Sequence, residues 1–244
     1  MEININCDLG EKSKLHSDHN DPELLSIVNS ANIACGYHAG DEETMSKVIQ
    51  ISKKNNVSIG AHPSFKDIEN FGRKRQNLNS SEIKKLIINQ YEILQSIASK
   101  HNEKVTHIKP HGALNNMACE DMELSITIAK TIEEIDKNLI YLVPTGSKME
   151  TAGNRFNLNI ACEIFADRNY EDDGNLVSRS KENALINDPN LAKSHVLKMV
   201  KNQSLNCLSG KQIPCKIVSI CIHGDNEASL DTARIIKNEL HDNG

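Results

Sequence analysis

The chain has 244 residues, of which 38% are hydrophobic and 25% are charged, and its formal net charge is −5. These values are typical of a folded chain with one substantial core, and they exclude wholesale disorder. The mild acidity argues against a dedicated nucleic-acid binder, and no apolar run approaches the roughly 18 residues of a membrane span. We therefore expect a single domain over residues 1–244, with neither nucleic acid nor a membrane as partner.

The seven cysteines include no Cys-x-x-Cys pair. An odd number without that spacing fits neither a disulfide framework nor a zinc ribbon. Several lie in apolar runs, as Cys35 and Cys221 do, so we expect thiols that are buried like small apolar residues in a reducing compartment. The first residues lack the basic start and apolar stretch of a signal peptide, and we expect a cytoplasmic protein.

Short runs with strand character alternate with stretches of helical periodicity from the first residues onward. A strand at 2–6 precedes a helix at 21–29, which begins with Asp21 and Pro22, and then a short strand at 33–34. Asp41 is a suitable N-cap for the next helix, and a third strand covers 57–61. The polar segment 64–79 is typical of a loop and ends at Asn79, which with Glu82 forms a capping box for a long amphipathic helix.

The same alternation continues through the second half of the chain. In order, we expect a strand at 105–108, a helix at 120–135, strands at 139–143 and 158–163 around a helix at 147–156, a polar loop at 166–188, a helix at 189–202, a small β excursion at 205–214, a strand at 217–222 and a helix at 227–240. Seven strands alternating with helices imply parallel pairing with right-handed crossovers. A closed barrel and an open doubly wound sheet both fit this periodicity.

Polar and titratable residues follow every expected strand. These segments are 6–11, 35–41, 60–63, 109–112, 144–147, 163–168 and 223–225. In parallel α/β proteins the carboxyl ends of the strands lie on one face, which holds the active site. The sequence therefore predicts a shared polar pocket at that face.

Four histidines stand at these strand ends, and imidazole either moves protons near neutral pH or binds a metal. They are His38, His62, His111 and His223, and the carboxylates near them are Asp8, Glu11, Asp41, Glu163, Asp167 and Asp225. No His-Glu-x-x-His pair is present, so local spacing does not assign a metal site, and the metal is unknown. For each histidine, a hydrogen-bonded structural role is the alternative.

Four cations accompany this set. Lys109 precedes Pro110, which favours an extended backbone at a strand end, and Arg73, Arg168 and Arg179 lie in polar loops. Such groups suit a carboxylate, a carbonyl oxygen or a phosphate, and a solvated surface charge is the alternative for each arginine. The chain has no P-loop, no Gly-x-Gly-x-x-Gly fingerprint and no Gly-x-Ser-x-Gly elbow. A nucleotide would bind by a non-standard route or on another chain.

The order of these motifs resembles the LamB/YcsF family. The resemblance rests on NCDLGE (6–11), SANIACGYHAGD (30–41), GAHP (60–63), FGR (71–73), KPHGAL (109–114), FADR (165–168) and HGD (223–225). It extends from residue 2 to about residue 240. The chain departs from the usual family pattern at Cys7, Glu42 and Asn115, and Asn115 is the change that bears on pocket shape.

The resemblance implies a distorted seven-stranded β/α (TIM-like) barrel of the glycoside hydrolase/deacetylase type. It also implies ATP-dependent opening of 5-oxo-L-proline to L-glutamate, with 5-oxoprolinase subunits B and C as partners and ATP, with Mg²⁺, as cofactor. Under this hypothesis Asp8, Glu11, His62, Lys109 and His111 are catalytic, with Asp8, Glu11 and Asp41 also available to Mg²⁺. The substrate-binding residues are then His38, Asp41, Arg73, Glu163, Asp167, Arg168, Arg179, His223 and Asp225.

Within this hypothesis, Lys109 or an arginine neutralises the developing charge, His111 or His62 moves a proton, and Arg168 binds the substrate carboxylate. Two other classes of function stay open. One is an ATP-independent, metal-dependent deacetylase or amidohydrolase acting on a small amide, which only the barrel type suggests. The other is a non-catalytic binding subunit.

Overall fold

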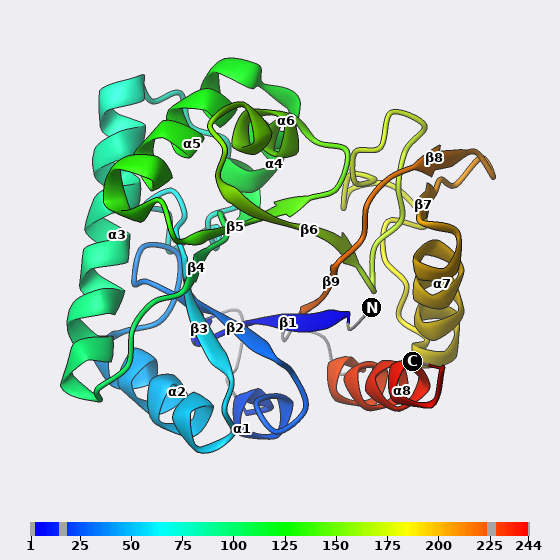
Figure 1. Ribbon diagram of the computed structural model, residues 1–244, viewed down its shortest axis with the longest axis horizontal. Helices are drawn as coiled ribbons and strands as arrows, with labels where there is room; N and C mark the ends of the chain where they lie inside the picture. The colour runs from blue at the N-terminus through cyan, green and yellow to red at the C-terminus, as the bar shows by residue number, and fades with distance from the viewer. Residues whose placement is uncertain (1–2, 15–18, 224–227, 244) are drawn as a thin grey trace.

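Seven parallel strands close into a barrel in the computed structural model, which describes residues 3–14, 19–223 and 228–243 (Figure 1). The strands are β1 (Asn4–Leu9), β2 (Ser30–Ala34), β3 (Ser58–His62), β4 (His107–Ile108), β5 (Ile140–Pro144), β6 (Asn159–Phe165) and β9 (Ser219–His223), and β9 pairs with both β6 and β1 to close the ring. The predicted seven-stranded barrel is confirmed, and the open sheet is excluded.

Helices surround this barrel on its outer side (Figure 1). They are α1 (Asp21–Leu24), α2 (Glu42–Lys54), α3 (Ser80–Lys100), α4 (Gly112–Glu120), α5 (Met122–Asp136), α6 (Lys148–Arg155), α7 (Pro189–Asn202) and α8 (Ser229–Asn243). The expected N-cap at Asp41 is confirmed, because its side chain accepts a hydrogen bond from the backbone N–H of Thr44. The capping box of Asn79 and Glu82 is confirmed at the start of α3.

The helices differ from the expected ones in two places. The helix expected at 21–29 ends at Leu24, because the chain must turn into β2 at Ser30. Helix α4 was not predicted, because the polar residues in its middle interrupt the helical spacing of its apolar residues. Asp121 separates α4 from α5. The Asp121 side chain accepts hydrogen bonds from the first backbone N–H groups of α5, which divides one long stretch into two helices.

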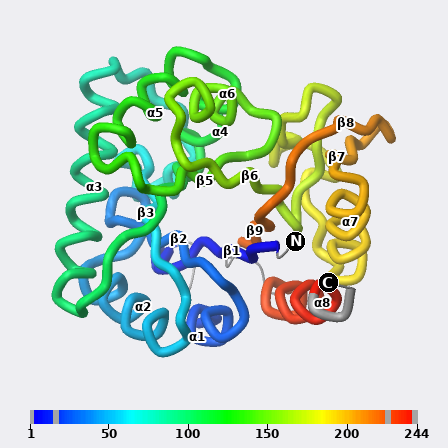
Figure 2. Tube along the Cα trace, viewed as in Figure 1, coloured from blue at the N-terminus to red at the C-terminus, as the bar shows by residue number. Residues whose placement is uncertain are grey.

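The expected β excursion is an antiparallel hairpin outside the barrel. It consists of β7 (Ser204–Asn206) and β8 (Gln212–Pro214) and lies beside α7 (Figure 2). Tyr170 forms bridges to Leu176 and Cys207, and its hydroxyl accepts a hydrogen bond from the backbone N–H of Phe165 at 2.8 Å. The long loop after β6 is therefore tied both to the hairpin and to the barrel.

The two faces of β1 have opposite chemistry. Ile5 and Leu9 belong to the buried apolar core, whereas the Asn6 side chain contacts Glu163 and Ser219 across the barrel. The interior of the barrel is thus polar at this level. Gly60 provides the space for this lining, because a Cβ there would lie 2.1 Å from the ring of His107.

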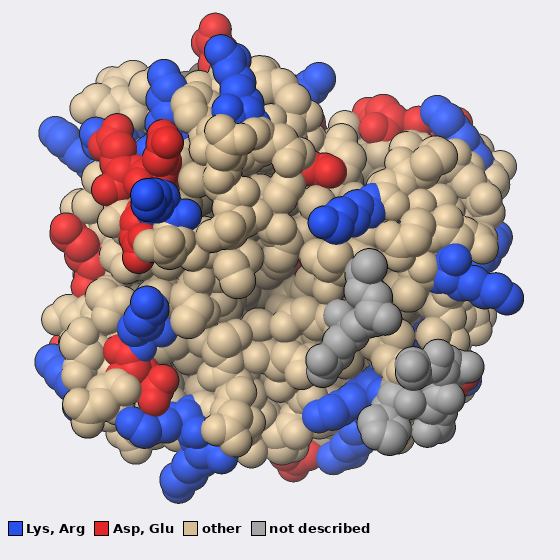
Figure 3. All heavy atoms as spheres, viewed as in Figure 1, with Lys and Arg blue, Asp and Glu red and all other residues tan. Residues whose placement is uncertain are grey.

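All seven cysteines are free thiols, five of them buried and two half-buried, as the sequence led us to expect. On the face shown in Figure 3, side chains of both charge signs are interspersed and lie mainly toward the edge. Within the described ranges, no helix combines the length and the apolarity needed to cross a bilayer.

Candidate active site

A cavity of about 360 Å³ opens at the carboxyl ends of the barrel strands. Its walls come from the ends of β1, β3, β4, β6 and β9 and from the loops that follow them. The predicted residues that line it include Asp8, Glu11, His62, Lys109, His111 and His223. Its size is within the usual range for a small-molecule site. The polar pocket expected at the strand ends is therefore present.

Asp8 and Lys109 form a buried ion pair at the floor of this cavity. Lys109 Nζ lies 2.9 Å from Asp8 Oδ1, and the two side chains are only 2% and 5% exposed. Burial by itself raises the pKa of Asp8, but the charges of His62 and Lys109 outweigh it and hold that pKa well below its ordinary value. Burial likewise opposes the charge on Lys109, yet Asp8 and its other neighbours raise the pKa of the ammonium well above its ordinary value. Both groups are charged at neutral pH.

The Lys109 ammonium is directed into the barrel rather than toward the pocket. It donates to Asp8, to the Sγ of Cys221 at 2.9 Å and to Asn6 Oδ1 at 3.4 Å. An ammonium has three hydrogens, and each of these partners can accept one. This arrangement places Lys109 as the group that orients and neutralises Asp8.

A chain of amides below Asp8 was not selected from the sequence. Asn32 donates to Asp8 Oδ1 at 2.7 Å and to Asn6 Oδ1 at 2.8 Å, and its own Oδ1 lies 3.0 Å from His107 Nε2. Burial lowers the pKa of His107 to about 3, so this ring is neutral. The sequence held one sign of this network, because the polar residues 4, 6 and 8 alternate with apolar residues along the first strand. Both faces of a barrel strand are enclosed, so polar side chains on such a strand are directed into the barrel.

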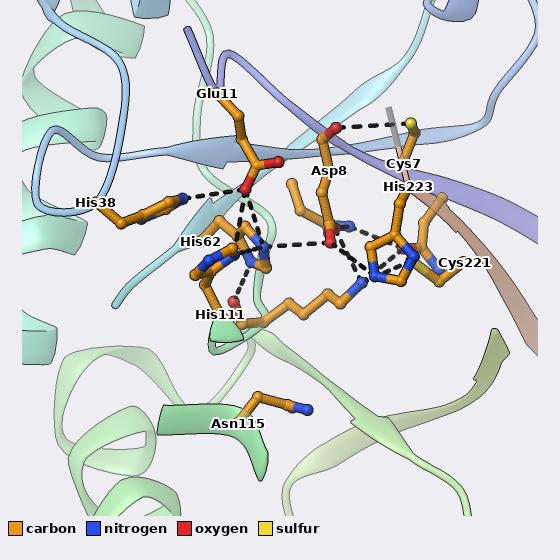
Figure 4. Close-up of polar contacts among 12 residues, drawn as sticks. Cys7, Asp8, Glu11, His38, His62, His111, Asn115, Cys221 and His223 are labelled. Atoms are coloured by element: carbon orange, nitrogen blue, oxygen red, sulfur yellow. Dashed lines mark hydrogen bonds and ion pairs between the residues drawn. The ribbon is translucent and has the colours of Figure 1, made fainter. Parts of the chain in front are cut away.

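Three imidazoles surround the carboxylate of Glu11 (Figure 4). Glu11 Oε1 lies 3.0 Å from His38 Nε2, 3.1 Å from His111 Nδ1 and 3.9 Å from His62 Nε2. Burial opposes ionisation of Glu11, but the hydrogen bonds from His111 and His38 outweigh it and hold the pKa of Glu11 well below its ordinary value. Glu11 is therefore an anion that several ring nitrogens share.

The rings of His62 and His111 are held by backbone carbonyl groups. His62 Nδ1 donates to the carbonyl of Lys109 at 2.6 Å, and His111 Nε2 donates to the carbonyl of Phe71 at 2.9 Å. Phe71 has a φ of 55°, in the left-handed region that non-glycine residues rarely adopt. This loop approaches α4 so closely that a Cβ at Gly112 would lie 2.7 Å from the carbonyl oxygen of Gly72.

His223 and Asp167 form a second acid–base pair across the pocket. His223 Nδ1 lies 2.8 Å and 2.9 Å from the two oxygens of Asp167, so Nδ1 carries the donated hydrogen. Although burial raises the pKa of Asp167, the charge and hydrogen bond of His223 lower it below its ordinary value. The other nitrogen, Nε2, lies 3.9 Å from Asp8 Oδ2. The ring also stacks on Phe165, which fixes its plane.

Glu163 lies in the barrel interior and does not line the cavity. Its Oε2 accepts from Asn6 at 3.0 Å and lies 3.4 Å from Lys109 Nζ. Burial raises its pKa above the ordinary value in spite of Lys109. Glu163 therefore belongs to the support of Asp8 and Lys109, not to the group of residues that reach a ligand.

The three predicted arginines line the upper wall of the cavity. Arg168 is 5% exposed and donates to the carbonyl oxygens of Val177 and Ala184, so it fastens the loop that follows β6. Burial, together with the nearby Arg179, lowers the pKa of Arg168 to about 10. Arg73 and Arg179 are exposed at the rim, and Arg73 also lies over the ring of Phe71.

One predicted site carboxylate has its role elsewhere in the fold. Asp41 is exposed and serves as the N-cap of α2, outside the residues that line the cavity, so it is a structural carboxylate. Asp225 lies outside the described residues. His38 lies behind Glu11, fully enclosed, and burial lowers its pKa to about 3.

The side chains of this site together supply chemical groups that can open an amide. Asp8 is an anion within reach of two imidazoles, His223 has a fixed tautomer with one nitrogen facing the pocket, and the rim is cationic. Such a set can move protons to and from a bound molecule and hold a negatively charged group.

Comparison with known proteins agrees with the order of the motifs. The sequence model of the LamB/YcsF family matches residues 3–244. The chain is 42% identical to the 5-oxoprolinase A subunit of Nitrobacter hamburgensis over 245 residues, which cover 100% of this chain and 96% of that protein.

Solved structures show the same relationship at the level of the fold. The chain resembles the lactam utilization protein from Thermus thermophilus with a TM-score of 0.91 and 30% identity, over 100% of this chain and 98% of the other. Peptidoglycan deacetylase PdaC from Bacillus subtilis, with a TM-score of 0.50, 11% identity and coverage of 100% and 85%, shares the barrel fold alone. The match to the family model across nearly the whole chain shows that this protein belongs to the LamB/YcsF family.

Proposed function

We propose that this chain is the A subunit of an ATP-dependent 5-oxoprolinase, which hydrolyses 5-oxo-L-proline to L-glutamate while ATP is cleaved to ADP and phosphate, in a complex with subunits B and C. The observation that carries the proposal is the pocket itself, in which Asp8 lies between His62 and His223 below a cationic rim. The relatives that bear the name of the 5-oxoprolinase A subunit support the same activity. The free thiols support a cytoplasmic location.

The chemistry explains the need for ATP. A five-membered lactam is a resonance-stabilised amide, and water opens it slowly. Transfer of the terminal phosphoryl group of ATP to the lactam oxygen releases ADP and makes the ring carbon electrophilic. One water then adds to that carbon, and the C–N bond breaks as the ring nitrogen takes a proton. A second water hydrolyses the resulting acyl phosphate to glutamate and phosphate.

His223 is the residue that we assign to proton transfer. Asp167 holds the hydrogen on Nδ1 and stabilises the imidazolium, so Nε2 can give a proton to the ring nitrogen or take one from water. Asp8, oriented by Lys109 and Asn32, lies 3.9 Å from that nitrogen and is placed to position the water.

The exposed guanidinium groups suit the carboxylate of the substrate. Arg73 and Arg179 stand at the mouth of the cavity, and a guanidinium binds a carboxylate through two parallel hydrogen bonds. We assign this role to Arg179 in place of Arg168, whose hydrogens go to backbone carbonyls. ATP, with Mg²⁺ on its phosphates, would approach the same cationic rim, either on this chain or from a partner protein.

The experiment is to mix the purified chain with subunits B and C, ATP, Mg²⁺ and 5-oxo-L-proline and to follow glutamate and ADP. We expect both products in equal amounts, and none when this chain, either partner or ATP is omitted. The chain carrying His223→Gln should form the same complex but release little glutamate. His101→Gln, whose ring pairs with Ser46 far from the cavity, is the matched control.

Each alternative has its own result. Glutamate release by this chain with a divalent metal and no ATP would support the amidohydrolase instead. If His223→Gln and Asp8→Asn weaken assembly but leave turnover per complex unchanged, the chain is a non-catalytic binding subunit. No glutamate in the presence of partners that are active with a relative of this chain would overturn the proposal.

A further inference from the structure

We propose that Glu11, His62 and His111 form a binding site for one divalent transition-metal ion, with the open side of the ion facing the pocket. This inference concerns the chain by itself, and it holds whether or not the chain acts on 5-oxo-L-proline. All three residues line the cavity. They come from three different strand ends, β1, β3 and β4, so the closed barrel is what brings them together.

The spacing of the three donor atoms fits a metal. His62 Nε2 and His111 Nδ1 lie 3.1 Å apart, Glu11 Oε1 lies 3.1 Å from His111 Nδ1, and it lies 3.9 Å from His62 Nε2. Ligands about 2.0–2.1 Å from a tetrahedral ion are about 3.3 Å from one another. An ion between these atoms would therefore need only small side-chain shifts.

The tautomers of the two rings point to the same place. His62 Nδ1 and His111 Nε2 both face backbone carbonyl oxygens, which only accept, so both of these nitrogens carry hydrogen. In neutral rings the inward nitrogens, His62 Nε2 and His111 Nδ1, then present lone pairs to each other and to an anionic carboxylate. A proton on one of these nitrogens holds the atoms together in the metal-free chain, as in the contacts of His111 with Glu11 and of His62 with Asp8, and a metal ion would take the place of that proton. A donated outer N–H is also the usual support of a metal-binding histidine.

His38 has a different place in this cluster. Its Nε2 lies 3.0 Å from Glu11 Oε1, but the residue does not line the cavity, and its buried Nδ1 has no hydrogen-bond partner among the described residues. If Nε2 bound the metal, Nδ1 would carry a buried hydrogen without an acceptor. If Nε2 instead donates to Glu11, Nδ1 needs no hydrogen. The geometry therefore makes His38 a positioning residue that orients Glu11.

The donor set indicates the class of ion. Two imidazoles and one carboxylate favour zinc, iron, cobalt or nickel over magnesium or calcium, which prefer oxygen ligands. Three protein ligands with the remaining side open to a pocket are typical of ions that activate water or polarise a carbonyl oxygen. Asp8 also lines the pocket, and its Oδ2 lies 3.3 Å from His62 Nε2, beside the proposed site.

The test uses the full chain, stripped with a chelator, then loaded with Zn²⁺ or Co²⁺ and desalted. Metal analysis should find one ion per chain, and the Co²⁺ form should show the visible absorption of a low-symmetry protein site. Glu11→Gln, His62→Gln and His111→Gln should each lose the retained metal and that absorption. His38→Gln should weaken Zn²⁺ binding about 10- to 100-fold without abolishing it.

Two controls keep the outcome clear. Glu133→Gln, on the exposed side of α5, and His101→Gln should bind metal as the unchanged chain does. Circular dichroism should show that the metal-free variants are folded. Failure of the unchanged chain to retain Zn²⁺, Co²⁺, Fe²⁺ or Ni²⁺ would mean that protons alone occupy the cluster, and retention by all three ligand variants would place the ion elsewhere. Either result would overturn the proposal.

Discussion

Lys109 Nζ and Asp8 Oδ1 lie 2.9 Å apart at the floor of the pocket and are almost sealed from water, although the two residues are 101 positions apart along the chain. Two buried charges tolerate this position only as a pair, because either one alone would lose its hydration without compensation. The pair therefore links the stability of the barrel to the geometry of the site.

Replacement of the cation should expose this link. Lys109→Met should lower the free energy of unfolding by about 3–5 kcal/mol, because it leaves Asp8 buried without its partner. The double variant Asp8→Asn with Lys109→Met should lose less than the sum of the two single variants. Urea unfolding at neutral pH measures this, with Lys100→Met, from the exposed pair with Glu42, as a control that should change little. Additive losses would contradict the coupling.

The Asp167–His223 pair should control turnover rather than folding. His223→Gln should lower glutamate release by the three-subunit complex about 10²- to 10⁴-fold, the usual loss for a general acid–base group. Asp167→Asn should also lower it, because an amide cannot stabilise the imidazolium. The midpoint of thermal unfolding of both variants should stay near that of the unchanged chain. Equal turnover in His223→Gln and His101→Gln would show that His223 takes no part in the reaction.

The buried ring of His107 should make stability depend on pH. Its pKa is about 3 in the folded chain, because of burial, against an ordinary value of 6.5. Between these values the unfolded chain binds a proton that the folded chain does not, so this histidine destabilises the fold as the pH falls. His107 contributes about 1.4 kcal/mol per pH unit to the slope of the free energy of unfolding against pH.

His107→Gln keeps a donor toward Asn32 and removes this titration. Between pH 6 and pH 4 its free energy of unfolding should therefore fall less steeply than that of the unchanged chain. Chemical unfolding at several pH values measures the two slopes, and His101→Gln serves as the control. The same slope for His107→Gln and the unchanged chain would show that His107 is already protonated in the folded state.

Gly72 should be essential to the histidine cluster. Its φ is +64°, and a Cβ there would lie 2.1 Å from Ser64 Oγ and 3.0 Å from both His111 and His38. Gly72→Ala should therefore destabilise the chain and displace His111. Gly210→Ala, at a φ of +90° with open space around it, should add only about 1 kcal/mol of backbone strain. Thermal unfolding and Co²⁺ absorption distinguish the two, and equal effects would deny the special role of Gly72.

The two arginines of the loop after β6 should behave differently. Arg179→Met should raise the KM for 5-oxo-L-proline about 10- to 100-fold, the equivalent of one lost charge-assisted contact, with little effect on unfolding. Arg168→Met should lower the unfolding midpoint as well, because its guanidinium holds the carbonyls of Val177 and Ala184. An unchanged KM in Arg179→Met would contradict this role for Arg179 and assign binding of the substrate carboxylate to Arg73.

Particular residues show how far sequence reasoning reached. The strand-end rule placed His62 and His223 correctly at the pocket, since the end of a strand is a local feature. The same rule failed to separate Asp41, which caps a helix outside the pocket, from Asp8, which lies at its floor. It passed over Asn32 and His107, because their side chains matter only once the strands enclose a common interior.

The alternation of strands and helices, the caps at Asp41 and Asn79 and the family itself could be predicted from the chain, because each depends on short segments whose pattern is independent of distant contacts. Three features of the site could not be predicted from the chain. They are the direction of the Lys109 ammonium, the tautomers of His62 and His111, and the role of Arg168 in holding backbone carbonyls. These depend on which atoms meet when segments a hundred residues apart close into one barrel. Local sequence patterns thus determined the secondary structure and the family, and closure of the barrel determined which side chains meet in the site.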